Sequence, residues 1–349
     1  MAATIISPIG RKPLDRIWLA RCPVPAASVV AWSLGWLTEE FARDGVAVSW
    51  IRDSGISADP VEAANQTRAL FREGGNIQAL AGRALGAKTR VIGLTWIDER
   101  QAIIVRPGEK IFEPKDLKGL RVALPDYAET RATSIVRGMS LHGLKGALAL
   151  AGLTLADIRF VDVPAPPVDF DTPDSFQHFW SGLNWLADGR VDAVYVKGAA
   201  AAELAARLGL VVAVDLDVHP SRLTRINNGT PRPITVHEYM LEHHFDIVVR
   251  FLDQTLRAAD WAANNLPALQ DILVNETLAS PGGVSAAYRN DFHRSLHPDL
   301  SRERIDMLRV QADFLRLHGF LEHSVDVDAW IDPRPLEAAL ALRAAHKAA

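Results

Sequence analysis

Short apolar runs of strand length alternate with segments of helical periodicity along the first two thirds of the chain. Residues 17–20 and 45–51 have strand length, and between them residues 27–41 place apolar side chains at helical spacing. The alternation continues to Leu216, and beyond Pro233 the composition turns helical. Strands that alternate with helices favour parallel sheets covered by helices. The sequence therefore predicts an α/β fold.

The length of the chain predicts two lobes. A single hydrophobic core seldom organises as many as 349 residues. Compact strand–helix units run from Gln101 to Leu216, so we expect this block to form lobe two, residues 101–216. Lobe one would then consist of both ends of the chain, residues 1–100 and 217–349. Two crossings between the lobes would form a hinge over a cleft.

Several individual elements can be predicted from periodicity. Within lobe two we expect strands over 101–106, 120–124, 158–163, 191–196 and 210–216. We expect helices over 61–72, 77–85, 127–140, 145–151, 176–186, 199–208, 243–264, 267–275, 286–296, 302–318 and 335–345.

Composition excludes several classes of protein. The formal net charge of −4, with basic residues scattered along the chain, argues against nucleic acid as a partner. A single cysteine rules out an internal disulfide framework and a cysteine-based zinc site. No apolar run reaches the length of a membrane span. The apolar residues 26–37 are followed by Glu39 and Glu40 rather than by a cleavage site, so we expect an unprocessed cytoplasmic chain.

The only cysteine lies where a strand is predicted to end and a helix to begin. Cys22 opens the segment Cys22-Pro23-Val24-Pro25, whose prolines would make a stiff extended entry into the helix. Ligands in open α/β sheets gather beyond the carboxyl ends of strands, and a helix N-terminus favours the thiolate form of a nearby cysteine. Cys22 is therefore a candidate reactive thiol; the alternative is a small buried apolar residue.

A second candidate site is an arginine before two glycines. Arg72 precedes Gly74 and Gly75, and a short helix is predicted to follow. Glycines before a helix allow backbone N–H groups to face an anion, and a guanidinium suits carboxylate, sulfinate or phosphate. The alternative is an ordinary glycine end to a preceding helix, with Arg72 in solvent.

Three segments together resemble the periplasmic-binding-protein type II fold, in its nitrate, sulfonate and taurine-binding branch. They are Gly74-Gly75, the run Pro114-Lys115-Asp116-Leu117-Lys118-Gly119-Leu120-Arg121-Val122-Ala123, and Leu186-Ala187-Asp188-Gly189-Arg190-Val191-Asp192-Ala193. The resemblance covers most of the chain and implies two α/β lobes with a cleft and hinge, and a helical C-terminal part.

A narrower resemblance is to the hydroxybiphenyl sulfinate desulfinases, which are built on that fold. It implies that Cys22 is the catalytic cysteine and that Arg72, with Gly74 and Gly75, binds the sulfinate. The family also has an active-site histidine between the cysteine and the arginine. Here no histidine occurs before His142, and Glu62 is the nearest candidate for polarising Cys22. A carboxylate disfavours ionisation of a thiol, so this departure favours proton donation by Cys22 over thiolate attack.

The resemblance implies further residues that face the cleft. Tyr127, Arg131 and Lys197 are the candidates from lobe two, and Pro23 and Trp96 complete the expected substrate-binding set. The substrate would be a small anionic organic molecule, and the polar cleft argues against the biphenyl compound itself. We expect neither a metal nor an organic cofactor.

These features predict a desulfinase-like enzyme that breaks a carbon–sulfur bond in an aromatic or other small organic sulfinate and releases sulfite. Two alternatives remain open. A decarboxylase on the same fold would use Arg72 to hold a carboxylate. A solute-binding protein for a small sulfonate or aromatic carboxylate would use the same anion site, and Cys22 would then be incidental.

Overall fold

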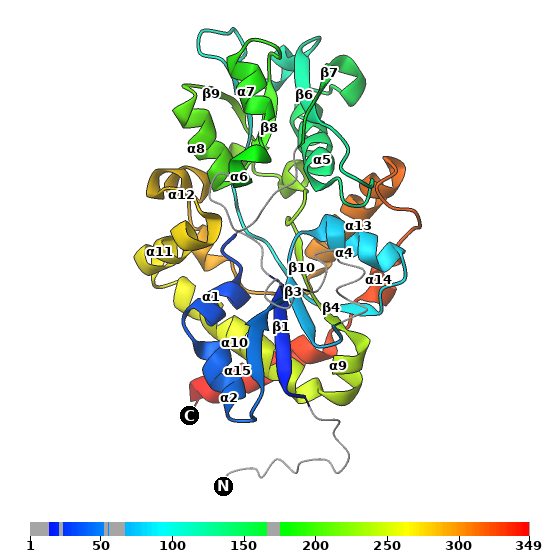
Figure 1. The fold of residues 1–349 in the computed structure, drawn as a ribbon, viewed down its shortest axis with the longest axis vertical. Coiled ribbons are helices and arrows are strands. Elements are labelled where there is room, and N and C mark those ends of the chain that lie inside the picture. The colour runs from blue at the N-terminus through cyan, green and yellow to red at the C-terminus, as the bar shows by residue number, and fades with distance from the viewer. Residues whose placement is uncertain (1–13, 21–23, 52–54, 56–66, 166–174, 349) are drawn as a thin grey trace.

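Two lobes stand one above the other along the longest axis of the molecule (Figure 1). The structure is a computed structural model and describes residues 14–20, 24–51, 55, 67–165 and 175–348. The lower lobe contains both ends of the described chain, and the upper lobe is built from its middle.

A five-stranded mixed sheet forms the centre of the lower lobe. Its order is β2-β1-β3-β10-β4. The strands are β1 (Arg16–Ala20), β2 (Ala47–Trp50), β3 (Leu70–Glu73), β4 (Thr89–Thr95) and β10 (Arg232–His237). β1 pairs in parallel with β2 and β3, whereas β10 runs antiparallel to both β3 and β4.

Strand β10 lies where the sequence pattern predicts the start of a helical region. Pro233 falls within it, and a proline inside an apolar run argues against a central strand. β10 nevertheless lies between β3 and β4 and pairs with both of them. Thr235 lies opposite Arg72, and the Gly74 N–H donates to the Pro233 carbonyl at 3.3 Å.

Strand β3 replaces the end of an expected helix. The prediction of a helix over 61–72 is wrong at its C-terminal end, since Leu70–Glu73 pair with β1 and β10. The Phe71 ring stacks on the Phe251 ring at 4.3 Å between centroids, so tertiary packing outweighs a mediocre local periodicity. Residues 61–66 of that expected helix lie outside the described chain.

The upper lobe contains two smaller sheets rather than one parallel sheet. β5 (Gln101–Val105) lies between β8 (Val194–Lys197) and β9 (Val211–Asp215) and is antiparallel to both. β6 (Arg121–Pro125) and β7 (Arg159–Val163) pair in parallel. The expectation of parallel sheets is therefore wrong for β5, which is antiparallel to both of its neighbours, and is confirmed for β6 and β7.

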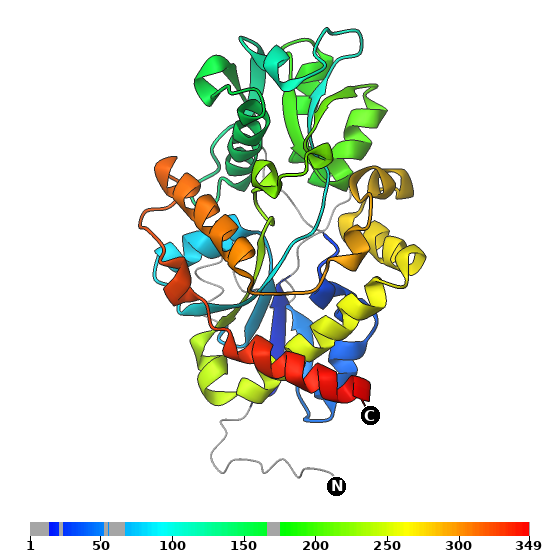
Figure 2. The same cartoon turned by 180° about the vertical axis from the view of Figure 1, so that it is seen from behind.

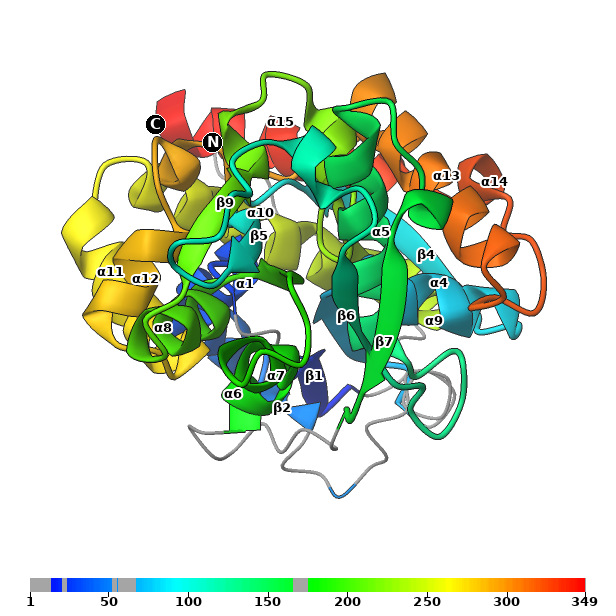
Figure 3. The ribbon, with the colours of Figure 1, turned by 90° about the horizontal axis from the view of Figure 1, so that it is seen from above.

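Helices cover the sheets. They are α1 (Ala27–Ser33), α2 (Trp36–Ala42), α4 (Asn76–Ala84), α5 (Ile135–Ala149), α6 (Ser175–His178), α7 (Gly182–Ala187), α8 (Ala199–Arg207), α9 (Glu238–His243), α10 (Phe245–Ala262), α11 (Leu266–Thr277), α12 (Pro281–Ala287), α13 (Arg302–Leu317), α14 (Val327–Trp330) and α15 (Arg334–Ala348). Seen from behind, α15 crosses the base of the lower lobe, where it packs along α10 (Figure 2). Seen from above, α11 and α12 lie on one side of the molecule and α4, α13 and α14 on the other (Figure 3).

Several predicted helix boundaries differ from those observed. The segment over 27–41 divides into α1 and α2 at Gly35, whose φ of +79° is a conformation that favours glycine. The two helices expected over 127–140 and 145–151 are the single helix α5, and residues 127–134 form the turn before it. The prediction of a helix over 286–296 is wrong beyond Ala287, where α12 ends, and within the expected range only the short 3-10 helix Phe292–Arg294 follows.

Charged side chains tie the two crossings together behind the cleft. Arg100 in the first crossing pairs with Asp215 at the end of β9, at 3.4 Å. Arg289 of the lower lobe contacts Asp215 at 2.8 Å and Asp217 at 3.2 Å. Arg225 of the second crossing pairs with Asp98 of the first at 2.6 Å. These ion pairs join the two crossings to each other and to the lower lobe.

Asp217, one of the acidic residues in these ion pairs, makes the stability of the fold depend on pH. Burial, followed by the neighbouring Asp215, raises the pKa of the Asp217 carboxyl to about 6 from a usual 3.8. Between these values the folded protein binds a proton that the unfolded chain does not, so this group stabilises the fold as pH falls through 6. We expect the free energy of unfolding of the wild type, relative to Asp217→Asn, to rise by about 1 kcal/mol between pH 7 and pH 5.

Urea unfolding of both proteins at the two pH values measures this difference. Asp291→Asn, at an exposed position, is the matched control and should run parallel to the wild type. Parallel profiles for wild type and Asp217→Asn would contradict the assignment.

Candidate functional site

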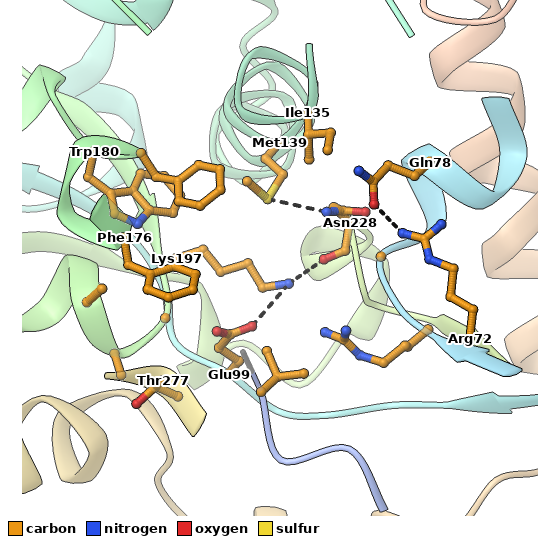
Figure 4. A pocket seen from close by; sticks show the side chains of 17 residues that line it. Arg72, Gln78, Glu99, Ile135, Met139, Phe176, Trp180, Lys197, Asn228 and Thr277 are labelled. Atoms are coloured by element: carbon orange, nitrogen blue, oxygen red, sulfur yellow. Dashed lines mark hydrogen bonds and ion pairs between the residues drawn. The ribbon is translucent and has the colours of Figure 1, made fainter. Parts of the chain in front are cut away.

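A cavity of about 150 Å³ lies between the lobes. Its lining residues come from both lobes and from both crossings: Val24, Arg72, Gly75, Gln78, Glu99, Ile135, Met139, Phe176, Phe179, Trp180, Lys197, Gly198, Ala199, Ala200, Asn228, Arg232 and Thr277. Figure 4 shows the aromatic side chains at one side of the cavity and Arg72 with Gln78 at the other.

Arg72 reaches the cavity from the end of β3. Its guanidinium donates a hydrogen bond to Gln78 Oε1 in the first turns of α4. The side chain folds back over Gly74, where an added Cβ would lie 2.9 Å from Arg72 Nε. The glycine therefore leaves room for the guanidinium. The expected anion contact from the Gly74 N–H is not supported, because that N–H is already bonded to Pro233 in the sheet.

Gly75 lines the cavity and lies against Asn228 of the second crossing. An added Cβ at Gly75 would overlap the Asn228 side-chain amide. That amide oxygen accepts from the Ile77 N–H at 3.1 Å, so it satisfies a free donor at the N-terminus of α4. The amide nitrogen faces Met139 Sδ at 3.7 Å. Asn228 thus joins α4 of the lower lobe to α5 of the upper one.

Lys197 is a buried cation in the cavity wall. Its ammonium donates to the Asn228 carbonyl at 2.6 Å and pairs with Glu99 Oε2 at 3.4 Å (Figure 4). The Tyr288 hydroxyl donates to the other oxygen of Glu99 at 3.2 Å. Glu99 comes from the first crossing and Tyr288 from the lower lobe, so these bonds span the hinge. Burying Lys197 and Glu99 is tolerated because each has a charged partner.

Aromatic side chains of the upper lobe form the opposite wall. Phe176 and Phe179 stack with ring centroids 6.1 Å apart, and Trp180 packs edge-on against Tyr195. Phe176 and Trp180 are both 6% exposed. Such a wall accommodates a flat apolar group.

The charges that line the cavity favour an anionic ligand. Arg72, Lys197 and Arg232 are cationic, and Glu99 is the one carboxylate among the described lining residues. Gly229 makes room for Arg232, since an added Cβ there would overlap the guanidinium. An anionic head at the arginines and a flat ring at the aromatic wall would use both ends of the cavity.

Glu73 is a buried acidic residue at the end of the strand that carries Arg72. The side chain is 2% exposed and points to the other face of the sheet from Arg72. It accepts hydrogen bonds from the Ser28 N–H at 3.1 Å and the Ser28 hydroxyl at 2.6 Å, in the first turn of α1. The Thr95 hydroxyl donates to its second oxygen at 3.0 Å. The positive end of α1 therefore already faces a carboxylate.

The structure brings only part of the expected site together. Arg72, Gly75 and Lys197 line the cavity. Cys22, Pro23 and Glu62 lie outside the described residues. Of the described residues near Cys22 in the sequence, Val24 lines the cavity, and Ala20 lies opposite Arg72 in the sheet.

Three expected binding residues lie elsewhere. Trp96 is 1% exposed and packs with Ile226 and Met307 in a small core of its own, apart from the cavity lining. The Tyr127 hydroxyl accepts a hydrogen bond from Arg131 at 2.9 Å, in the turn before α5. That turn faces the end of α13 in the lower lobe, where Tyr127 lies beside Phe320.

Sequence reasoning missed Gln78, Glu99, Asn228 and Arg232, which line the cavity. Glu99 and Asn228 lie in the two crossings. The sequence shows that these crossings are polar, but it does not show that they lie close together. Arg232 lies in the unexpected strand β10. Trp180, which a helical pattern alone leaves open between core and cleft wall, lines the cavity.

The described ranges contain neither a metal-binding cluster nor a membrane-spanning helix. No group of three or more histidine, cysteine or acidic side chains there could hold a metal ion. Within the same ranges no helix combines the length and the apolar character needed to cross a bilayer.

Comparisons with known proteins show which proteins this chain is similar to. No family model matches the chain. The chain is 27% identical to the 2'-hydroxybiphenyl-2-sulfinate desulfinase of Rhodococcus erythropolis over 356 residues, covering 93% of this chain and 94% of the relative.

Solved structures show the same fold. The desulfurization enzyme DSZB matches with a TM-score of 0.77 at 24% identity, over 94% of this chain and 99% of that one. A cysteine-to-serine variant of DSZB in complex with biphenyl-2-sulfinic acid matches with a TM-score of 0.73 at 24% identity, over 95% and 100% of the two chains. The periplasmic aliphatic sulphonate binding protein SsuA of Escherichia coli gives 0.67 at 17% identity, over 92% of each chain. The predicted two-lobed fold and the resemblance to a desulfinase are confirmed.

Gly75 gives a direct test of the cavity as an anion site. In Gly75→Ala the new methyl displaces Asn228, which then loses its bond to Ile77 and disturbs the carbonyl that holds Lys197. We expect the affinity for benzenesulfonate, an unreactive probe with an anionic head and a ring, to fall about tenfold by calorimetric titration.

Gly282→Ala is the matched control, because its Cβ would meet only Ser280 Oγ at 3.7 Å. It should bind the probe like the wild type. Equal binding by Gly75→Ala, with an unchanged melting temperature, would contradict this assignment of the cavity.

Proposed function

We propose that the chain is a desulfinase-like enzyme that cleaves the carbon–sulfur bond of an aromatic sulfinate and releases sulfite. The observation that carries the proposal is that Arg72 and Val24 line one cavity between the lobes. Val24 belongs to the Cys22-Pro23-Val24-Pro25 segment, which supports a position for Cys22 near Arg72. The similarity to a desulfinase supports the same reaction.

Substrate binding follows from the two ends of the cavity. The sulfinate oxygens would accept hydrogen bonds from Arg72 and face the positive charge of Arg232. The aromatic ring would lie against Phe176 and Trp180. This placement puts the carbon that carries sulfur between the arginine end and the aromatic wall. Closure of the lobes around the ligand would exclude bulk water and strengthen each charge interaction.

The thiol of Cys22 would act as the proton donor. A proton passes from sulfur to the ring carbon, a C–H bond forms, and the C–S bond breaks with its electron pair kept by the ring. Sulfur dioxide leaves, water hydrates it to hydrogen sulfite, and the proton released in hydration restores the thiol. The balance is one sulfinate and one water to one arene and one hydrogen sulfite. This chemistry requires a thiol that is protonated at the start of the cycle.

Glu73 supports a neutral thiol over a thiolate nucleophile. A free helix N-terminus would stabilise a thiolate at the entry to α1. Here the Glu73 carboxylate already accepts hydrogen bonds from Ser28 in the first turn, so the charge of the helix end is offset. The absence of a histidine between residues 22 and 72 in the sequence points the same way, since no imidazole in that interval can take the thiol proton.

A solute-binding role is the second candidate. Sulfonate-binding proteins share the fold, and SsuA covers 92% of this chain. The cationic cavity would bind a sulfonate head as well as a sulfinate head. The two roles differ in what Cys22 does: a binding protein has no need of the thiol.

Cys22→Ser separates these roles. We expect the wild type to release one sulfite for each aryl sulfinate consumed, with benzenesulfinate as the substrate. The serine variant should lose at least about 100-fold in turnover, because a hydroxyl is a much weaker acid than a thiol. Its affinity for benzenesulfonate should stay within about twofold of the wild type. Sulfite is measured colorimetrically and the arene by chromatography.

Arg72→Gln is the companion variant. Removing the guanidinium should weaken probe binding by about 10-fold to 100-fold and reduce turnover with it. Undiminished turnover in Cys22→Ser would overturn the proposed role of the thiol. Tight probe binding without sulfite release from any sulfinate would favour the solute-binding role.

A further inference from the structure

A second, smaller cavity of about 30 Å³ lies between α4 and the lower sheet. Its wall comes from α4, from the ends of β3 and β10, and from the residues that lead into β4. The lining residues are Thr67, Leu70, Arg72, Gln78, Ala79, Gly82, Ala87, Thr89, Thr235, Val236 and His237. This volume admits a small polar group and is too small for an aromatic ring.

Arg72 and Gln78 line both cavities. Their hydrogen-bonded pair therefore forms the wall that the two cavities share. Thr235 lies directly opposite Arg72 in the sheet, so both side chains emerge on the face that α4 covers. A group in the small cavity would contact the guanidinium from the side away from the aromatic wall.

Threonine hydroxyls supply the other polar contacts. Thr67 is 5% exposed, and its hydroxyl has no hydrogen-bond partner among the described residues. A buried hydroxyl without a partner is costly, and a bound group would remove that cost. The Thr89 hydroxyl accepts from Trp330 Nε1 at 3.2 Å, which leaves its own hydrogen to donate into the cavity.

We propose that this small cavity is a subsite for an inorganic oxyanion, and that it receives the sulfite product. The inference rests on the proposed desulfinase function for the identity of the anion. The guanidinium of Arg72 supplies charge, and the hydroxyls of Thr67 and Thr89 supply neutral donors around it. Small size and hydroxyl donors select a compact oxyanion over an organic acid.

The shared wall gives the subsite a role in turnover. The sulfinate head lies at the Arg72 end of the main cavity, so sulfite forms beside the wall. A rotation of the Arg72 and Gln78 side chains would carry the anion into the small cavity while the arene still occupies the aromatic end. The two products would then leave independently of each other.

Simultaneous binding tests the proposal without turnover. The wild type is titrated with sodium sulfite by calorimetry, alone and with saturating benzenesulfonate in the main cavity. We expect one sulfite per chain to bind even when benzenesulfonate fills the main cavity, with the affinity of the small cavity reduced by no more than about threefold because both anions share Arg72. The same titration with sulfate separates a general oxyanion subsite from one selective for sulfite.

Two substitutions locate the sulfite. Thr67→Val removes the hydroxyl at nearly constant volume and should weaken sulfite binding about tenfold. Gly82→Ala adds a methyl to the cavity wall and should weaken it at least as much. Neither should change benzenesulfonate affinity. Thr277 lines the main cavity but not the small one, so Thr277→Val is the matched control. It should leave sulfite binding intact.

Full competition between sulfite and benzenesulfonate would overturn the subsite, as would unchanged sulfite binding in both Thr67→Val and Gly82→Ala. Melting temperatures of the variants check that each remains folded. A chain that binds both anions together but releases no sulfite from any sulfinate would keep the subsite and lose the desulfinase function. The two proposals therefore fail by different measurements.

Discussion

The site depends on the return of the chain to the lower lobe as β10. This strand separates β3 from β4 and bonds to both, so it fixes where β3 ends. Arg72 takes its position opposite Thr235, and Gly74 takes its position from a bond to Pro233. The arginine that faces the cavity is thus held by residues about 160 positions further along the chain. The cavity is complete only when the chain has passed into the inserted lobe and returned to the lower lobe.

The cavity lining carries cationic side chains that attract an anion, whereas the charged residues around the cavity form ion pairs. Lys197 is paired with Glu99, and the hinge behind it holds arginines and aspartates in alternating contact. Glu73, one residue from Arg72, faces the opposite side of the sheet and occupies the positive end of α1. Because side chains alternate along a strand, Arg72 faces the ligand cavity and Glu73 faces the N-terminus of α1. The arginine favours an anionic ligand, and the glutamate disfavours a thiolate at that helix end.

Local sequence signals predicted the fold class and most strands and helices, because these elements have clear periodicity. Arg72 could be singled out because a glycine pair follows it, and Gly75 indeed lines the cavity. The failures concern long-range placement. β10 was not predicted because it contains Pro233. The end of an expected helix is instead β3, which pairs with β1 and β10. Trp96 packs into a separate core. Asn228 and Glu99 could not be found from the sequence, since their roles exist only where the two crossings meet.

The late arrival of β10 also shapes how the protein is made. During synthesis, β1 to β4 emerge well before residues 232–237, and until then the facing edges of β3 and β4 have no strand between them. Unpaired edges of this kind invite pairing with other chains. The strands of the inserted lobe lie within residues 101–215, so they too emerge before β10. A nascent chain that ends before residue 232 would therefore expose the strand edges that β10 later covers.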